Sequence, residues 1–319
     1  MRYAVVGAGS WGANHVRTAA SLHEEGLLDE LVVCDVDERR ARRLAEAYDL
    51  PFRTDVADCS IDAATVATPT RTHHDLGTRL LESGVDLLVE APLAATPADA
   101  RDLVETAADH DRTLAAGHSL RYLPALVELR RRIEGGELGT IEYLQTNYFS
   151  FRAPQTTAGV LDSIGIHDVD IFAYLLDPTD LEPDPDTVLV DETDRATTLV
   201  VDYGETVGVV NVSWETPAAG TCRHLLVAGD ERSAYVDYLD DVGLELHDDR
   251  DGGSEPRSID TRGEGPLKAA LIDFLHAVET GSEPRVSGRI GAEAVSVLER
   301  AREPTGRDAP LAGEVDERS

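Results

Sequence analysis

The first third of the chain alternates short apolar runs with segments whose apolar residues recur at helical spacing. One such segment places Ala13, Val16 and Ala20 on a single helical face, and another does so with Leu80 and Leu81. Strands that alternate with helices predict βαβ units and a doubly wound parallel sheet. The predicted strands are 3–6, 31–34, 63–67, 87–89 and 113–116.

The pattern changes after about residue 120. A helix near 124–134, a strand near 141–151 and a helix near 164–176 precede β-rich runs joined by Asp/Gly turns, which indicates an antiparallel sheet. Two amphipathic helices follow. We expect an α/β protein with a first domain over 1–120, a second α/β domain over 121–305 and a mobile tail over 306–319. The β-rich runs are 197–203, 207–214, 224–228 and 233–239, and the acidic segments 177–186 and 248–265 are predicted loops.

A glycine motif follows the first predicted strand and opens a helical segment. In that context the GxGxxG pattern predicts a dinucleotide site, because its glycines allow a tight turn and a close approach to a pyrophosphate at the helix N-terminus. The motif consists of Gly7, Ala8, Gly9, Ser10, Trp11 and Gly12.

Asp35 ends the second predicted strand, where an acid accepts hydrogen bonds from the ribose 2′-hydroxyl of a bound dinucleotide. The same carboxylate repels a 2′-phosphate, so NAD is favoured over NADP. Arg39 and Arg40 weaken this preference, since either can stack on adenine or meet a phosphate.

The charge balance of the chain indicates the salt conditions in which it works more than the kind of partner that it binds. The chain carries 29 basic and 61 acidic residues, a formal net charge of −32, and Lys268 is its single lysine. Molar salt shortens the Debye length to about 3 Å and screens such repulsion. This composition is typical of an extreme halophile, and it argues against nucleic-acid binding, which needs clustered Lys and Arg.

Other classes lose support from the same sequence. No apolar stretch approaches the roughly 18 residues of a membrane span, and the first strand begins directly after Met1, which leaves no room for a signal peptide. We therefore expect a cytoplasmic protein without a membrane partner. Cys34, Cys59 and Cys222 have no paired spacing, so neither a disulfide framework nor a metal site is expected.

Two later motifs resemble a known family. Thr68-Pro69-Thr70-Arg71-Thr72-His73 and Gly84-Val85-Asp86-Leu87-Leu88-Val89-Glu90-Ala91-Pro92 are similar to the TPxxxH and GxHVxxEKP motifs of the glucose–fructose oxidoreductase/inositol dehydrogenase/MocA (Gfo/Idh/MocA) family. The resemblance covers essentially the whole chain. Among the subgroups, the segments 166–170 and 212–217 are most similar to archaeal UDP-N-acetylglucosamine 3-dehydrogenase-like proteins.

The resemblance implies an N-terminal Rossmann domain and a C-terminal α/β domain with a large open, mostly antiparallel sheet. It also implies oxidation of a sugar or cyclitol secondary alcohol with hydride passing to NAD(P). Thr68, Pro69 and His73 are implied to lie along the cofactor, and Glu90 at its nicotinamide end. By analogy, the open sheet implies a homodimer or homotetramer.

Two departures from the family pattern bear on catalysis. Ala91 stands where the family has a lysine that handles the substrate hydroxyl proton, and loss of a general acid/base typically costs about 10²–10⁴-fold in rate. Ser163 stands where the family often has an acid four residues before its histidine, and Asp162 precedes it. Ser163 is more readily interpreted as a helix cap, whereas for Asp162 capping and catalysis are equally open.

His167 aligns with the catalytic histidine of the family. It also shares a helical face with Ile164, Ile171 and Tyr174, so a buried core histidine is the competing interpretation. As a catalytic residue, a neutral imidazole would take the hydroxyl proton while hydride leaves. Asp170 is expected either to orient this ring or to form a surface ion pair.

Three residues after the last strand of the first domain lie where doubly wound sheets bind ligands: His118, Arg121 and Tyr122. Arg121 either holds an anionic substrate or pairs with a carboxylate, and the acidic composition favours pairing. We assign Arg121, Tyr122 and Asp170 provisionally to the substrate site.

These observations predict an NAD-dependent oxidoreductase that acts on a sugar or UDP-sugar. Ala91 keeps two alternatives open. One is a biliverdin reductase-like reductase that works without the family lysine, and the other is a non-catalytic NAD-binding regulatory protein.

Overall fold

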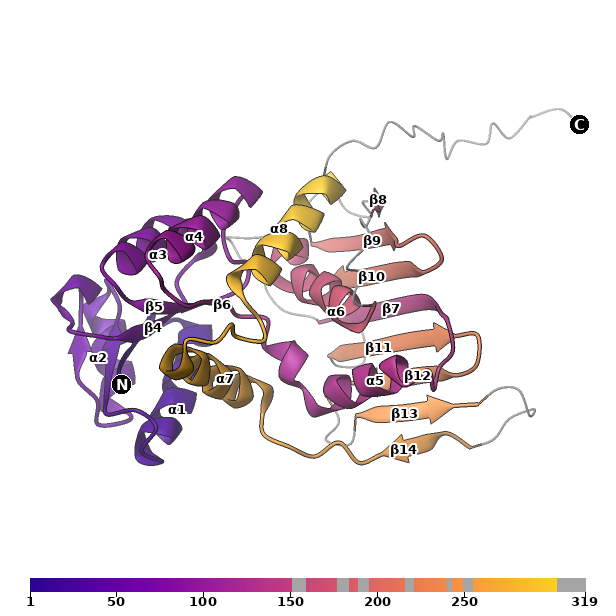
Figure 1. The fold of residues 1–319 in the computed structure, drawn as a ribbon, viewed down its shortest axis with the longest axis horizontal. Helices are drawn as coiled ribbons and strands as arrows, with labels where there is room; N and C mark the ends of the chain where they lie inside the picture. Colours follow the sequence, from indigo (N-terminus) through magenta and orange to yellow (C-terminus); the bar gives the residue numbers. More distant parts are fainter. Residues whose placement is uncertain are drawn as a thin grey trace, which may run out of the picture.

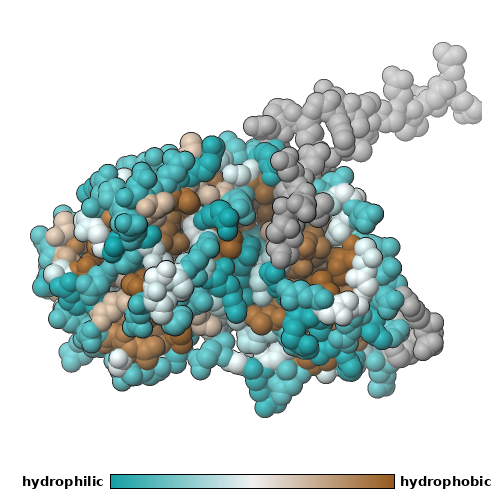
Figure 2. Space-filling model, in the orientation of Figure 1, coloured by the Kyte–Doolittle hydropathy of each residue, from teal (hydrophilic) through white to brown (hydrophobic). Residues whose placement is uncertain are grey.

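The computed structural model describes residues 1–150, 159–176, 184–188, 195–215, 221–239, 243–248 and 255–302, arranged around two sheets (Figure 1). The tail predicted over 306–319 lies outside the described residues. Within them, no helix is long and apolar enough to cross a membrane. Figure 2 shows a mostly hydrophilic surface on the side it displays, as the excess of acidic residues leads one to expect.

The first sheet is parallel and has the strand order β3-β2-β1-β4-β5-β6. Its central strands are nearly continuous apolar runs because helices cover both faces. The order reverses beside β1, which creates the switch point where such sheets bind ligands. The doubly wound fold is confirmed, although the two-residue β3 was not predicted. The strands are β1 (Arg2–Val6), β2 (Glu30–Cys34), β3 (Phe52–Arg53), β4 (Ala63–Val66), β5 (Asp86–Val89) and β6 (Leu114–Ala116).

Helices and short 3₁₀ turns connect these strands. The α-helices are α1 (Ser10–Glu24), α2 (Glu38–Glu46), α3 (His73–Glu82) and α4 (Pro97–Asp109). The 3₁₀ turns are η1 (Val56–Asp58), η2 (Thr70–Thr72) and η3 (Ser119–Tyr122). The α4 N-terminus shows how local sequence sets these bounds: Thr96 accepts a hydrogen bond from the Asp99 amide, and Pro97 occupies the first turn, where its missing N–H costs nothing.

The second sheet has eight strands in the order β14-β13-β12-β11-β7-β10-β9-β8, and α5 (Pro124–Glu134) and α6 (Ile166–Leu176) lie on one of its faces (Figure 1). Among the described strands of this sheet, only β7 and β10 pair in parallel, so the mostly antiparallel prediction is confirmed. Its strands are β7 (Ile141–Phe149), β8 (Asp184–Val188), β9 (Ala196–Asp202), β10 (Val207–Ser213), β11 (Cys222–Gly229), β12 (Ser233–Asp237), β13 (Leu244–His247) and β14 (Arg257–Ile259).

Two predicted loops contain edge strands. Asp184–Val188 forms β8 within the segment 177–186 and just beyond it, and Arg257–Ile259 forms β14 within 248–265. Both are at the sheet edges, where pairing on one side suffices and polar residues are tolerated. Their sequences therefore lack the apolar alternation on which the prediction depended.

The helix that carries His167 starts earlier than predicted. A π-helical turn, η4 (Leu161–Gly165), precedes α6, and its N-cap is Val160. Asp162 and Ser163 consequently lie inside the helix, and neither side chain caps it, so the capping interpretation is wrong. The Ser163 hydroxyl is buried without a hydrogen-bond partner.

The last two helices join the sheets. In α7 (Pro266–Thr280), Phe274 packs edge-on against Tyr3 of β1 at 6.5 Å and belongs to the core around α1. Helix α8 (Gly288–Arg302) contacts both α4 and α6, and Ser287 forms an isolated bridge with Ala115 of β6. These contacts fix the second sheet against the carboxyl edge of the first.

Candidate active site

The glycine loop between β1 and α1 requires glycine at two positions. Gly7 has φ +107°, and a Cβ there would meet the Ala67 carbonyl oxygen at 2.4 Å. A Cβ on Gly12 would lie 1.9 Å from the Gly7 oxygen, so α1 could not approach the loop with any other residue. Gly9 differs, because a Cβ there would meet nothing within 4 Å.

The open space at Gly9 fits a dinucleotide pyrophosphate. Gly9 is the N-cap of α1, it offers no side-chain hydrogen bond, and the first turn contains no acid. The free N–H groups and the positive end of the helix dipole are therefore available to an anion. Ser10 and Trp11 stand in this first turn, and Trp11 is half exposed. The residues present thus fit NAD.

Asp35 connects the end of β2 to the glycine loop. Its Oδ2 accepts a hydrogen bond from the Ala8 amide at 2.7 Å, and its Oδ1 accepts one from the Asp37 amide at 2.8 Å. The carboxylate is held at the predicted ribose position and at the same time fixes the loop. The Arg39 side chain is almost fully exposed nearby, 4.0 Å from Asp37, and Val36 is 91% exposed.

His73 pins two cofactor-side segments together. Its Nδ1 is 2.9 Å from the Pro92 carbonyl oxygen and its Nε2 is 2.8 Å from the Thr68 carbonyl oxygen, and the ring is buried. Burial lowers the pKa of His73, although the two carbonyls oppose that shift. The ring therefore positions the turn that begins with Thr68 and Pro69, with both nitrogens occupied by backbone.

Glu90 lies buried beside a histidine that sequence reasoning missed. His15 Nε2 is 2.5 Å from Glu90 Oε1, and the Ala91 amide donates to Oε2 at 3.1 Å. Burial by itself raises the pKa of Glu90, but the hydrogen bond and charge of His15, together with Trp11 and His167, outweigh it and hold that pKa below the usual value. Gly117 makes room for the acid, because a Cβ there would come within 2.7 Å of Oε2. The available signal was the position of His15 on the inner face of α1.

His167 and His118 form the other side of this site. Their ring centroids are 5.6 Å apart, and the planes are inclined at 73°. Burial, then the electrostatic interaction with His118 and the positive charge of Arg223, lower the pKa of His167 to about 3. Burial also lowers the pKa of His118, so both imidazoles are neutral at ordinary pH. His167 is thus able to accept a proton, and its Nδ1 has no hydrogen-bond partner.

Asp170 forms an ion pair with Arg121 instead of orienting the His167 ring. The Arg121 guanidinium donates to both Asp170 oxygens at 2.6–2.9 Å, and the pair is buried. His118 Nδ1 is 3.6 Å from the same carboxylate. The favoured pairing of Arg121 with a carboxylate is observed, whereas the surface location considered for the Asp170 pair is wrong, because tertiary packing of η3 on α6 encloses it.

The Tyr122 hydroxyl donates to Asp273 of α7 at 2.8 Å. The polar groups of Arg121, Tyr122 and Asp170 are therefore engaged with protein partners. Their contact with substrate stays a prediction.

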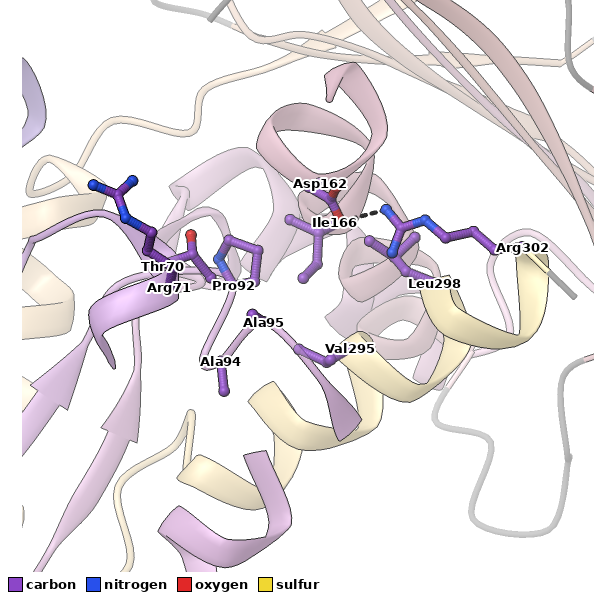
Figure 3. Close-up of a pocket in the computed structure, with 10 residues that line it drawn as sticks. All are labelled: Thr70, Arg71, Pro92, Ala94, Ala95, Asp162, Ile166, Val295, Leu298 and Arg302. Carbon is purple, nitrogen blue, oxygen red and sulfur yellow. Dashed lines mark hydrogen bonds and ion pairs between the residues drawn. The ribbon is translucent and has the colours of Figure 1, made fainter. Parts of the chain in front are cut away.

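Asp162 faces a pocket between the domains. Its Oδ1 accepts a hydrogen bond from Arg302 of α8 at 2.5 Å, and Figure 3 shows this pair at the end of a pocket that Pro92 and Ile166 also line. The pocket has a volume of about 140 Å³. His167 is not among its lining residues, so Asp162 and His167 are not brought together there.

A parallel sheet with a pyrophosphate cradle at its switch point, facing a mixed sheet across buried histidines, is how a nicotinamide-dependent oxidoreductase is built. Residues 1–118 match the family model of the oxidoreductase family with an NAD-binding Rossmann fold, and residues 126–235 match the GFO/IDH/MocA C-terminal domain. The chain belongs to the GFO/IDH/MocA family of oxidoreductases.

Similar proteins support this assignment. Inositol 2-dehydrogenase 1 of Saccharopolyspora erythraea is 34% identical over 187 residues, which is 55% of this chain and 54% of that relative. UDP-N-acetylglucosamine 3-dehydrogenase of Acidithiobacillus ferrooxidans is 27% identical over 290 residues, 87% of this chain and 88% of the relative. The solved structure of the latter shares the fold with a TM-score of 0.83 and 24% identity, covering 95% of this chain and 96% of that one. A levoglucosan dehydrogenase complex with NADH and levoglucosan shares it with a TM-score of 0.81 and 18% identity, covering 94% and 96%.

Proposed function

We propose that this protein oxidises a secondary alcohol of a sugar or nucleotide sugar with NAD, or catalyses the reverse reduction. Support comes from the NAD-binding family model and from the alignment with UDP-N-acetylglucosamine 3-dehydrogenase over most of both chains. The observation that carries the proposal is the placement of a neutral, half-buried His167 close enough to Glu90 for each to influence the pKa of the other, across the domain junction.

When bound, NAD supplies the acceptor for the hydride that leaves the alcohol carbon. His167 takes the hydroxyl proton, so the C–H bond electrons leave with the hydride and the O–H bond electrons form the new carbonyl. Asp35 holds the adenosine ribose through its 2′-hydroxyl, and the Gly9 cradle takes the pyrophosphate. The buried Glu90–His15 pair fixes the nicotinamide end.

Ala91 is the residue that supports the two alternative functions. It is half-buried directly after Glu90, where the family lysine would stand, and a methyl group moves no proton. A non-catalytic NAD-binding regulator or a biliverdin reductase-like reductase would tolerate this residue. Intact His167 favours the dehydrogenase over both.

Substitution of His167 by alanine tests the proposal. In molar KCl, reduced nicotinamide is followed with NAD across sugars, cyclitols and UDP-sugars, and NADH binding is measured on the same samples. We expect His167→Ala to lose about 10²–10⁴-fold in kcat with unchanged NADH affinity, as removal of a general base does. His74→Ala is the matched control, because His74 pairs with Asp102 on the outer side of α3. Equal turnover of His167→Ala and the wild type would remove His167 from the mechanism.

The remaining assignments concern setting and assembly. The excess of 61 acidic over 29 basic residues supports a halophile, and we retain an archaeal origin and a cytoplasmic location as proposals. The sheet face opposite α5 and α6 carries half-buried Tyr143 and Val209 and exposed Val207, which supports a homodimer or homotetramer through this face. Light scattering in molar KCl measures the assembly directly.

A further inference from the structure

Arg223 occupies a position of strand β11 whose equivalents further along the strand are apolar. On β11, Arg223 lies two residues before buried Leu225 and four before buried Val227. Its side chain is therefore on the same face of the sheet as theirs, the face that α6 covers (Figure 1). It pairs across the ladder with Tyr148 of β7, and its carbonyl accepts a hydrogen bond from the Tyr238 amide. The guanidinium carbon lies 4.9 Å from the Tyr148 ring centroid and 5.2 Å from that of Tyr238. The two rings hold the cation between them.

One polar atom of Arg223 is buried without a partner within the described part of the chain. Its Nε is buried with no hydrogen-bond partner, and it forms no ion pair although acidic residues outnumber basic ones by 61 to 29. Buried polar groups normally have partners, and an unpaired one is destabilising. Stacking on tyrosine stabilises the cation, but a ring face accepts no N–H at the guanidinium edge. The fold thus keeps a preformed donor fork without an acceptor.

Three further polar atoms near Arg223 are buried without partners, one of them on the proposed base. Arg223 influences the pKa of both His167 and Asp168, which places it close to each. Asp168 Oδ2, the Tyr238 hydroxyl and His167 Nδ1 are all buried without hydrogen-bond partners. Four buried polar atoms without partners are uncommon in one part of a packed interior, and they mark the surroundings of Arg223 as suited to a polar ligand.

Resting on the proposed function, we infer that Arg223, framed by Tyr148 and Tyr238 and flanked by Asp168, binds an oxyanion of the substrate, either a carboxylate or a phosphate. Guanidinium recognises both groups by paired, charge-assisted hydrogen bonds. In a chain this rich in carboxylates, an arginine that forms no ion pair with the described ones favours a substrate that carries an oxyanion. Asp168 contributes a hydrogen-bond donor when it is protonated, and burial raises its pKa to about 7.

The test compares the binding of charged and neutral sugars to the enzyme saturated with NADH, at one fixed KCl concentration. Isothermal titration calorimetry is performed with D-glucuronate and D-glucose as the carboxylate arm, and with UDP-N-acetylglucosamine and N-acetylglucosamine as the phosphate arm. Arg223→Met removes the charge and keeps the stem, whereas Arg223→Lys keeps the charge and loses the fork. Arg257→Met is the matched control, because Arg257 is exposed on the edge strand β14, where it pairs with half-buried Glu137.

We expect at least one anionic sugar to bind the wild type more tightly than its neutral counterpart. Arg223→Met should weaken that affinity about 10- to 100-fold, the range of a lost charged hydrogen bond, and leave the neutral sugars within about twofold. The affinity of Arg223→Lys for the anionic sugar should lie between those of the wild type and Arg223→Met. Arg257→Met should match the wild type. The arm that responds identifies the carboxylate or the phosphate.

A wild-type chain that prefers neutral sugars, or an Arg223→Met chain that keeps the anion preference, overturns the subsite. Should Arg223→Met not fold, inorganic phosphate is titrated against the wild type. Phosphate that fails to compete with any anionic sugar overturns the subsite equally. NADH formation is recorded in parallel: absence of turnover with every sugar counts against the proposed dehydrogenase, while the binding comparison alone decides the role of Arg223.

Discussion

Two glycines of one motif should respond to the same substitution in opposite ways. Gly9 has φ −75° and ψ −174°, a conformation open to any residue, and its Cβ would meet no atom within 4 Å. Gly9→Ala should therefore fold as the wild type does, because the gain of about 0.4–1 kcal/mol from a restricted unfolded chain is offset by the poorer N-cap that alanine makes. Gly12→Ala instead places a Cβ 1.9 Å from the Gly7 oxygen and 2.8 Å from the Gly7 carbonyl carbon.

The magnitudes decide the outcome at Gly12. Alanine gains about 1 kcal/mol over glycine inside a helix, but that gain requires the helix to stay in place. Relief of the overlap with backbone atoms needs α1 to move by about 1 Å, and overpacking costs about 1–3 kcal/mol in ordinary cores. We expect a net destabilisation of at least about 1 kcal/mol for Gly12→Ala.

Cofactor binding separates the variants further. The Cβ of Gly9→Ala enters the space assigned to the pyrophosphate, so NADH affinity should fall about 10- to 100-fold, as after loss of one charged hydrogen bond. Urea unfolding without cofactor gives the stabilities, and NADH fluorescence titration gives the affinities. Wild-type NADH affinity in Gly9→Ala, or equal unfolding midpoints for the two variants, would refute the assigned roles of these glycines.

Three other substitutions probe the site. Ala91→Lys should raise kcat by about 10²-fold or more if the rest of the site awaits a lysine proton carrier, and an unchanged kcat in the same NADH assay would show that another group moves the proton. Asp35→Ser should shift the ratio of NADP to NAD affinity about 10-fold or more towards NADP, because Arg39 is exposed beside it, and a titration with both cofactors that finds no shift contradicts the ribose assignment. Burial raises the pKa of Asp168 to about 7, so the folded chain keeps a proton that the unfolded chain releases near pH 4. The stability of the folded chain therefore falls as the pH rises from about 4 to 7. Asp168→Asn should therefore be more stable than the wild type above pH 7, on the order of a few kcal/mol, and identical pH dependences of the urea midpoint would count against this burial.

The sequence predicts best what local geometry dictates. Parallel strands buried on both faces are continuous apolar runs, and Gly7 and Gly12 are required by contacts within one loop and its neighbouring strand, so strands and motif were both identified. Edge strands β8 and β14 were missed because single-sided pairing imposes little on their residues. Helix α6 starts early because a π turn extends it, which periodicity does not reveal.

The polar contacts of the site depend on tertiary packing and were less predictable. His15 meets Glu90 across 75 residues, and Arg121 meets Asp170 across 49, so spacing along the chain carries no signal for either pair. Arg223 did have a signal, since it is a charged residue in the apolar register of a strand. Such a residue is costly to bury without a ligand or partner, and this cost is the physical reason to examine it.

The family lysine is absent at Ala91, so the proposed proton transfer depends on His167. The charge of Arg223 affects the pKa of that same imidazole. Burial is the largest cause of the low pKa of His167, about 3, and the positive charge of Arg223 lowers it further; so weak a base transfers protons poorly near neutral pH. An oxyanion bound at Arg223 offsets that charge and raises the pKa of His167 towards the range in which a base works well. On the proposed subsite, an anionic sugar therefore strengthens the base that oxidises it, whereas a neutral sugar leaves that base weak. Selectivity for anionic sugars should consequently appear in kcat as well as in affinity, and a preference confined to KM would separate the subsite from the proton transfer.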